Sequence, residues 1–170
     1  MTSADPFPDV RWGSERSRLR KAAVAFGSSP LGSWLLRTAT PLDRTLLLRS
    51  RGRFTLLGPI GAPTVLLTTT GAKSGQPRTT PLLYWRDGGR LHVVGSNFGQ
   101  GHHPAWTGNL LKEPRATVTI GGKDVPVRAT LLTGPERERV WQGFVDMAST
   151  YAVYKTRTDR DIRVFALEAV

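Results

Sequence analysis

The residues best suited to chemistry in this 170-residue chain lie in one short segment, Thr68–Pro81. Its sequence, TTTGAKSGQPRTTP, places Lys73, Ser74 and Arg78 around a turn that contains two glycines. Lysine supplies a point charge, arginine supplies a planar two-pronged donor, and a glycine-containing turn can aim backbone N–H groups at one point. The segment therefore predicts a site for an anion such as phosphate. The alternative is an ordinary hairpin loop with exposed cations.

A second polar segment, Gly95–Asn109, follows an expected strand and leads into an expected helix. Its Ser96, Asn97 and Asn109 offer side-chain donors and acceptors, which suit hydrogen bonding to the polar edge of a planar ring. Trp106, in the first helical turn, can either stack on such a ring or fill the hydrophobic core. Core packing is the commoner role of a tryptophan.

A third segment, Met147–Arg157, carries Tyr151 and Tyr154. Residues three positions apart lie on one face of a helix, so we expect the two rings side by side. They either pack in the core with their hydroxyls at its rim, or form a lid over a flat ligand. In the second case a phenol can donate a proton.

Several other kinds of catalytic site lack their motifs in this sequence. The segment around Lys73 does not have the spacing of a P-loop, no Gly-x-Ser-x-Gly elbow occurs, and no βαβ unit follows the glycines at 95–101. His92, His102 and His103 have no nearby carboxylate or cysteine at ligand spacing, so we expect no metal site.

Net charge is the outlier of the composition. The chain has 24 Lys and Arg against 13 Asp and Glu, a formal net charge of +11, and it has no cysteine. Such a charge indicates an anionic partner, whether nucleic acid, a membrane surface or an anionic small molecule. Without cysteine there are no disulfides, thiolate nucleophiles or Cys-ligated metal clusters. The basic residues are scattered and form no nucleic-acid recognition motif, so we expect no nucleic-acid partner.

The front of the chain has the higher charge density. Residues 1–60 contain ten Lys and Arg against four Asp and Glu. We expect a loose tail over residues 1–13 and short helices at 14–26 and 41–48, which pack on the core or rest on an anionic membrane through residues 14–50. No stretch reaches the roughly 20 apolar residues of a spanning helix, and no signal peptide is recognised. These features predict a cytoplasmic protein. A further hypothesis is that it associates with the inner face of the membrane.

From residue 64 onward the pattern changes to strands. Alternating apolar and β-branched residues bounded by turn residues predict strands at 65–70, 79–85, 91–96, 116–120, 125–132 and 163–167. Helices are expected at 104–113 and at 134–147, where the apolar residues share one face. Successive hairpins with inserted helices indicate an α+β fold, a small antiparallel β-barrel with helices outside it.

In this order and spacing, the three polar segments resemble the deazaflavin-dependent nitroreductase family, whose members use coenzyme F420. The matching elements are Leu66–Arg78 with Pro81-Leu82, Ser96-Asn97 with Gly99, His103–Leu110 with Pro114, Tyr151-x-x-Tyr154, and Thr158-x-Arg160. The resemblance covers about residues 41–170. It implies a split β-barrel domain there, similar to FMN-binding split barrels, with residues 1–40 as a separate N-terminal tail and helical segment.

The resemblance also implies which residues hold the coenzyme. Those expected to bind its phosphate and glutamate tail are Lys73, Ser74 and Arg78. Those expected to line its path are Thr79, Thr80 and Pro81. Those expected near the deazaflavin ring are Ser96, Asn97, Trp106 and Asn109. Those expected at the border of the substrate pocket are Tyr151 and Tyr154.

The implied activity is that of an F420H2-dependent reductase, which passes a hydride to a quinone-like or nitro-compound acceptor. The protein then supplies orientation, electrostatics and exclusion of water. The proton for the reduced acceptor is expected from Tyr154, Tyr151, Ser96 or water. Ala72 stands where many relatives have an arginine, and Ala148 stands where nitroreductive relatives can have a tyrosine. The second departure favours quinones over nitro-compounds.

Two other functions remain open on the sequence alone. The first is an FMN-binding split-barrel oxidoreductase, since the same barrel shape can accept a phosphorylated isoalloxazine. The second is a non-enzymatic protein that binds an anion or nucleic acid, and its only support is the net charge of +11.

Overall fold

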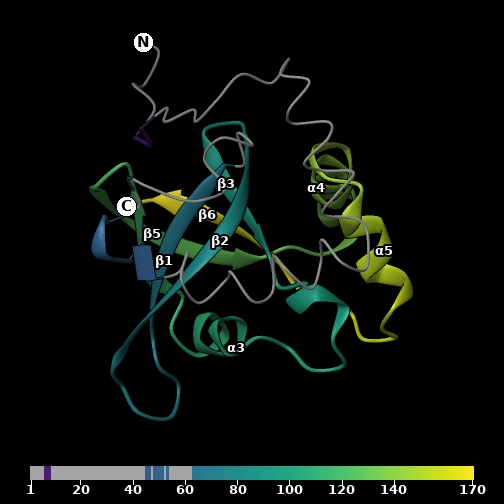
Figure 1. Ribbon diagram of the computed structural model, residues 1–170, viewed down its shortest axis with the longest axis horizontal. Helices are drawn as coiled ribbons and strands as arrows, with labels where there is room; N and C mark the ends of the chain where they lie inside the picture. Colours follow the sequence, from purple (N-terminus) through teal and green to yellow (C-terminus); the bar gives the residue numbers. More distant parts are fainter. Residues whose placement is uncertain (1–5, 9–44, 47, 52, 54–62) are drawn as a thin grey trace.

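In the part of the chain that the structure describes, six antiparallel strands close into a barrel in the order β1-β2-β3-β6-β5-β4 (Figure 1). The strands are β1 (Thr64–Thr70), β2 (Pro77–Asp87), β3 (Arg90–Val94), β4 (Arg115–Ile120), β5 (Lys123–Leu131) and β6 (Val164–Ala169). The structure is a computed structural model, and it describes residues 6–8, 45–46, 48–51, 53 and 63–170.

Helices flank the barrel on two sides. They are α3 (Ala105–Lys112), α4 (Gly134–Met147) and α5 (Thr150–Thr156), and a short 3-10 turn, η2 (Asn97–Gly99), precedes α3. Figure 1 shows α3 beside the β1–β2 loop at one end of the barrel, with α4 and α5 together along one side. These elements confirm the predicted α+β fold with an antiparallel barrel and external helices.

Local sequence explains the two tight hairpins. The β2–β3 turn uses Gly88 and Gly89, and the β4–β5 turn uses Gly121 and Gly122, all with positive φ. A two-residue turn with positive φ at both positions matches the twist of the strands that it joins, and glycine adopts this conformation at little cost.

The barrel interior is filled by side chains that alternate along the strands. Apolar residues from all six strands, each at most 6% exposed, form this core: Val65, Leu67, Tyr84, Leu91, Val93, Val118, Ile120, Val125, Val127, Phe165 and Leu167. Trp106 and Leu110 of α3 belong to the same cluster. The packing of these two residues therefore fixes α3 against the barrel.

The outer face of β3 and β6 forms a second core with α4 and α5. Val94, Val164 and Ala166 point away from the barrel interior and pack with α4 residues, among them the fully buried Phe144. The apolar face predicted for residues 134–147 is therefore the face that α4 buries. Met147, at the end of this face, is only partly buried.

Phe7 departs from the expected loose tail. Its side chain is 3% exposed and belongs to the barrel core, and its carbonyl accepts a hydrogen bond of 2.5 Å from Nη2 of Arg86. The expectation of a loose tail over residues 1–13 is therefore wrong at this residue. Figure 1 shows residues 6–8 at the end of the barrel opposite the β1–β2 loop.

The other N-terminal predictions concern mostly residues that the structure does not describe. The helix expected at 14–26 lies outside it, and the one expected at 41–48 is described only at residues 45–46 and 48, which are helical. No helix among the described residues has the length and apolar character needed to cross a bilayer.

The packing of α4 on the barrel leads to a test with two glycines. A Cβ at Gly143 would lie 2.6 Å from the Trp85 ring, whereas a Cβ at Gly108 in α3 would meet nothing within 4 Å. Alanine gains about 1 kcal/mol over glycine in a helix, but overpacking costs about 1–3 kcal/mol. We expect Gly143→Ala to lower the free energy of unfolding by up to about 2 kcal/mol, and Gly108→Ala to raise it by up to about 1 kcal/mol.

Urea unfolding of both variants and the wild type measures these changes. Gly108→Ala is the matched control, because it changes helix propensity without the contact. Equal stabilisation by both substitutions would show that α4 does not approach Trp85 as closely as described.

Candidate functional site

The loop between β1 and β2, residues 71–76, is held in place by two side chains of α3. Oδ1 of Asn109 accepts a hydrogen bond from the Ala72 N–H at 2.9 Å, and Nδ2 of Asn109 donates to Oγ1 of Thr69 at 2.9 Å. Nζ of Lys112 donates to the Ala72 carbonyl at 2.6 Å. Asn109 is 6% exposed, so its amide is buried with both ends hydrogen-bonded. The loop position is thus tied to the helix that packs on the barrel core.

The loop also closes on itself. The Gly71 N–H donates to the Gln76 carbonyl, and the Gly75 N–H donates to the Gly71 carbonyl, each at 2.8 Å. A Cβ at Gly71 would lie 2.7 Å from Oγ of Ser74 and 3.1 Å from the Gln76 carbonyl oxygen, so the loop packs closely around this glycine. These contacts confine the loop to one shape.

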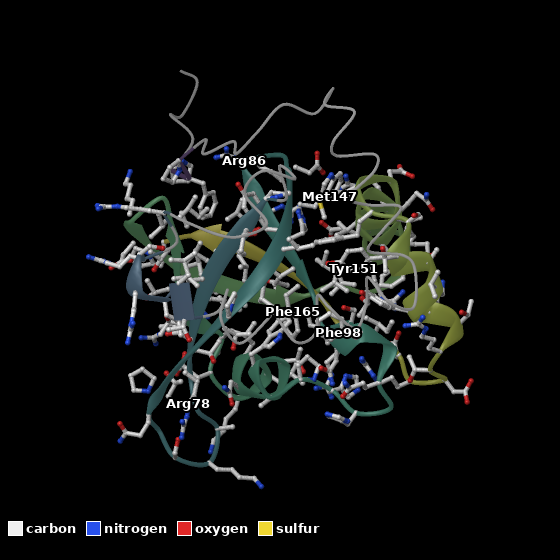
Figure 2. All side chains as sticks on the ribbon, in the orientation of Figure 1. Arg78, Arg86, Phe98, Met147, Tyr151 and Phe165 are labelled. Atoms are coloured by element: carbon white, nitrogen blue, oxygen red, sulfur yellow. The ribbon has the colours of Figure 1, made fainter. Side chains whose placement is uncertain are left out.

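Two cationic side chains stand exposed on this preformed loop. Lys73 and Arg78 are exposed, and neither side chain has a hydrogen bond or ion pair with a described residue. Oγ of Ser74 accepts a hydrogen bond of 3.3 Å from the Gln76 N–H. The backbone N–H groups of Lys73 and Ser74 make no hydrogen bond within the described chain. Figure 2 shows Arg78 beside the loop, away from the barrel core at Phe165.

The structure therefore brings Lys73, Ser74 and Arg78, which the sequence singled out, onto one surface. The three residues expected to line the coenzyme path continue along β2, where Thr79, Thr80 and Pro81 are half-buried and pair with β1. Oγ1 of Thr79 lies 2.9 Å from Oγ1 of Thr68 on β1, which ties the two strands together at the base of the loop.

The second polar segment forms a tight turn after β3. Asn97 and Phe98 have φ of 46° and 55°, and Ser96 is half-buried where the turn begins. Nδ2 of Asn97 donates to the His102 carbonyl at 3.1 Å. The Asn97 side chain therefore serves the turn itself.

Arg160 is the residue at this turn whose role sequence reasoning missed. Its Nε donates to the Gln100 carbonyl at 2.8 Å, and its Nη2 donates to the carbonyls of Gly95 and Ser96 at 3.0 and 2.6 Å. Its Nη1 lies 3.2 Å from Nδ1 of His103. The Thr158-x-Arg160 match drew attention to Arg160. Nothing in the sequence indicated that its side chain contacts residues about 60 positions earlier.

Lys112 was missed as well, although a local signal was available. It follows Asn109 by three positions in the expected helix, and residues at this spacing share a helical face. Both side chains therefore reach the same loop residue, Ala72.

Trp106 takes the core role of the two that the sequence left open. It is 4% exposed, and its ring centroid lies 5.7 Å from that of Phe165 within the barrel core. With Asn109 also buried, two of the four residues expected near the deazaflavin ring lie beneath the surface formed by the loop and α3.

The two tyrosines lie on one face of α5, as expected, but in different surroundings. Tyr151 is 7% exposed and packs against Phe144, with ring centroids 5.1 Å apart. Burial, and to a smaller extent Tyr154, raises the pKa of the Tyr151 phenol far above its usual value. Tyr154 is half-buried, and its ring lies 5.7 Å from Tyr151 and 6.1 Å from the exposed ring of Phe98. Figure 2 shows Phe98 near Tyr151 on the α5 side of the molecule.

The three histidines have different surroundings. His92 is fully buried in β3, His102 is exposed, and His103 contacts Arg160. Burial lowers the pKa of His103, and Arg163 and Arg160 lower it further. Among the described residues, no group of three or more His, Cys, Asp or Glu side chains is placed to hold a metal ion.

Comparisons with known proteins add to this geometry. The family model described as F420H(2)-dependent quinone reductase matches residues 40–169. A curated F420H(2)-dependent quinone reductase of Mycobacterium tuberculosis (strain H37Rv) is 39% identical over 112 residues, which cover 64% of this chain and 75% of the relative.

Two solved structures have the same fold. An F420-H2 dependent reductase superposes with a TM-score of 0.58 and 43% identity, covering 62% of this chain and 94% of that protein. A protein described as a domain-swapped dimer superposes with a TM-score of 0.59 and 38% identity, covering 78% of this chain and 99% of its own. These matches confirm the resemblance, the split barrel and the F420H2-dependent reductase activity that it implied. Because the family match includes the cationic loop, the turn and α5, the chain belongs to the F420H(2)-dependent quinone reductase family of oxidoreductases, which use reduced coenzyme F420 as hydride donor.

Proposed function

We propose that this chain transfers a hydride from F420H2 to a quinone, with the anionic tail of the coenzyme at Lys73 and Arg78 and the acceptor beside Tyr154. The observation that carries this proposal is the pair of exposed cations, without partners among the described residues, on a loop that α3 holds in place. We assign the activity to the barrel domain, residues 41–170, which lies almost entirely within the family match at 40–169.

The donor set at the loop fits an anionic tail. Lys73, Arg78, the Ser74 hydroxyl and the backbone N–H groups of the loop are all donors, and Thr68–Pro81 contains no acidic residue. Phosphate and carboxylate groups are bound by such sets, because charge-assisted hydrogen bonds are the strong ones. When bound, reduced F420 supplies the hydride, and the protein supplies its orientation.

Asn109 and Trp106 act beneath this surface in the proposal. Asn109 fixes the position of the loop relative to α3 through its hydrogen bond to Ala72, and Trp106 fixes α3 in the barrel core. Ser96 and Asn97 remain the proposed neighbours of the coenzyme ring, since the turn that contains them lies between β3 and α3.

A quinone is the acceptor that the residues near Tyr154 favour. The ring of Phe98 is 51% exposed and meets Tyr154 edge to face, which offers an apolar aromatic surface to a flat acceptor. Ala148 supplies no hydroxyl where nitroreductive relatives can carry a tyrosine, so nitro-compounds are expected as incidental substrates.

Tyr154 is the better candidate of the two tyrosines for proton donation to the reduced acceptor. Its ring is half-buried and reaches the exposed Phe98, whereas Tyr151 is almost fully buried with its pKa raised by burial. A phenol that is both buried and harder to ionise is the weaker donor. Ser96 and water are the other sources in the proposal.

Contact with an anionic membrane surface through residues 14–50 is a separate hypothesis. It rests on the excess of ten Lys and Arg over four Asp and Glu in residues 1–60. Most of these residues lie outside the described part of the chain.

Binding of F420 followed by turnover tests the proposed function directly. We expect the purified full chain to quench F420 fluorescence on binding, and to oxidise F420H2 faster with quinones than with nitro-compounds. Protein that ignores F420 and purifies with a flavin spectrum would support the FMN alternative instead.

The two exposed cations give a mutational test. Each of Lys73→Ala and Arg78→Ala should weaken F420 binding by about 1–3 kcal/mol, the range for a lost hydrogen bond to a charged group. Arg128→Ala is the matched control, because Arg128 is exposed on β5 and its side chain has no hydrogen bond or ion pair with a described residue. Calorimetric titration measures all three, and unchanged affinity in both loop variants would remove the anion site from the proposal.

The roles of the tyrosines can be separated by two conservative substitutions. Tyr154→Phe should lower kcat for quinone reduction by about tenfold or more, because positioned general acids contribute about 10²–10⁴-fold and water can replace part of this. Tyr151→Phe should leave kcat within about twofold, since its phenol is not the proposed donor. Steady-state rates in H2O and D2O provide the measurement, and an equal loss in both variants would contradict the assignment.

A further inference from the structure

The turn after β3 holds an aromatic residue in a costly conformation. Asn97, Phe98 and Gly99 are consecutive residues with φ of 46°, 55° and 75°. Left-handed backbone is unfavourable for residues with a side chain, and for a bulky one it is a genuine outlier. Such strain persists only where the surrounding structure enforces it.

Burial of Phe98 does not enforce this strain, because the residue is 51% exposed. The exposed ring also gains little from the hydrophobic effect, which scales with the apolar area removed from water. The strained residue therefore puts an apolar group on the surface beside the proposed acceptor site.

Arg160 supplies the contacts that bracket the turn. It donates to the carbonyls of Gly95 and Ser96, which come before the strained residues, and to the Gln100 carbonyl and Nδ1 of His103, which follow them. The four donor–acceptor distances run from 2.6 to 3.2 Å. One planar guanidinium thus fixes both ends of the turn at once.

The partners of Arg160 differ from those of the arginines that form ion pairs. Arg90, Arg137 and Arg139 pair with carboxylates, whereas Arg160 forms no ion pair with any described residue. Its partners are three carbonyls and an imidazole. Only the fork of an arginine reaches such partners together, because a lysine ammonium is a compact donor on a flexible stem.

The bracketed turn docks on α5. The Phe98 ring meets the Tyr154 ring at 6.1 Å with an interplanar angle of 80°. A Cβ at Gly99 would lie 2.9 Å from Cβ of Arg157 and 3.1 Å from the Tyr154 carbonyl, so backbone and helix are in close contact. The position of the turn thus determines where Phe98 stands relative to Tyr154.

We propose that Arg160 is a positioning residue, which holds residues 95–103 in the strained turn so that the Phe98 ring lies beside Tyr154 and contacts the acceptor. Arg160 itself does not touch the acceptor. The inference rests on the proposed function, because it assigns Phe98 and Tyr154 to the acceptor side. It adds Phe98 as a specificity-determining residue and Arg160 as the group that places it.

The first experiment compares Arg160→Ala and Arg160→Lys with Arg128→Ala in the full chain. We expect both Arg160 variants to raise KM for a quinone about tenfold or more, because small misplacements of a positioning group are costly. The Kd for F420, from fluorescence quenching, should rise by a smaller factor than the quinone KM, because the proposed contacts of its anionic tail at Lys73 and Arg78 do not involve Arg160. Arg128→Ala should change neither quantity. An unchanged quinone KM, or a loss confined to F420 binding, would overturn the proposal.

Chemical rescue separates positioning from folding. Arg160 lines a pocket of about 320 Å3 together with residues of α4 and α5, so its side chain borders a space that a small cation can enter. Added guanidinium should lower the quinone KM of Arg160→Ala toward the wild-type value and should leave Arg160→Lys unchanged. A lack of rescue in a folded Arg160→Ala protein counts against the proposal.

The strained residue provides a second variant that keeps the proposal testable if Arg160→Ala does not fold. Phe98→Gly removes both the ring and the backbone strain, because glycine accepts positive φ. We expect its melting temperature to stay the same or rise while the quinone KM rises about tenfold. A KM unchanged from wild type would show that Phe98 does not contact the acceptor.

A double-mutant cycle then asks whether Arg160 acts through Phe98. If it does, adding Arg160→Ala to Phe98→Gly should raise the quinone KM little further, since coupled residues are not additive. Additive effects would show that Arg160 acts independently of the ring.

One readout does not depend on activity at all. Because a guanidinium only donates, Nδ1 of His103 is an acceptor and the proton of the neutral ring lies on Nε2. Side-chain 15N shifts should report this tautomer in the wild type and its loss in Arg160→Ala. If F420 or quinone turnover fails, the proposed function fails, and the 15N shifts still test whether Arg160 holds the turn.

Discussion

The buried amide of Asn109 is the interaction on which the candidate site depends. It bonds at one end to Thr69 in β1 and at the other to Ala72 in the loop, while the rest of α3 packs in the barrel core. A buried amide is stable only when its donors and acceptors are satisfied, so loop, strand and helix must keep one relative position. Asn109 therefore positions the exposed Lys73 and Arg78 without itself having to contact a ligand.

Arg160 does the same for the second half of the site. Asn109 reaches across 37 positions to Ala72, and Arg160 reaches across about 60 positions to Gly95–His103. In both places a polar side chain from a distant part of the chain fixes the position of a loop. This arrangement leaves the side chains of Lys73, Arg78 and Phe98 without a hydrogen bond to any described residue.

Local patterns predicted the elements well for a physical reason. Strand alternation, paired glycines in the hairpins and the apolar face of α4 are all properties of neighbouring residues, so the chain order alone reveals them. The burial of Phe7, the choice of Trp106 between core and ligand, and the strained turn at Phe98 depend on contacts between distant segments. Contacts of this kind produce no periodic pattern of residues in the sequence. The family motifs supplied the candidate site residues, but not which of them lie beneath the surface.

The net charge of +11 is informative only once each cation is matched with its partner. Arg90, Arg137 and Arg139 sit in ion pairs with acidic residues, and pairs of this partly exposed kind contribute about 1 kcal/mol or less. Lys73 and Arg78 have no acidic partner among the described residues, and their loop segment contains no acidic residue that could neutralise them. An anion that approaches this loop therefore meets uncompensated positive charge on a loop whose conformation is already fixed. The grouping of two unpaired cations on one preformed loop, rather than the total charge, distinguishes the candidate site from the general basicity of the chain.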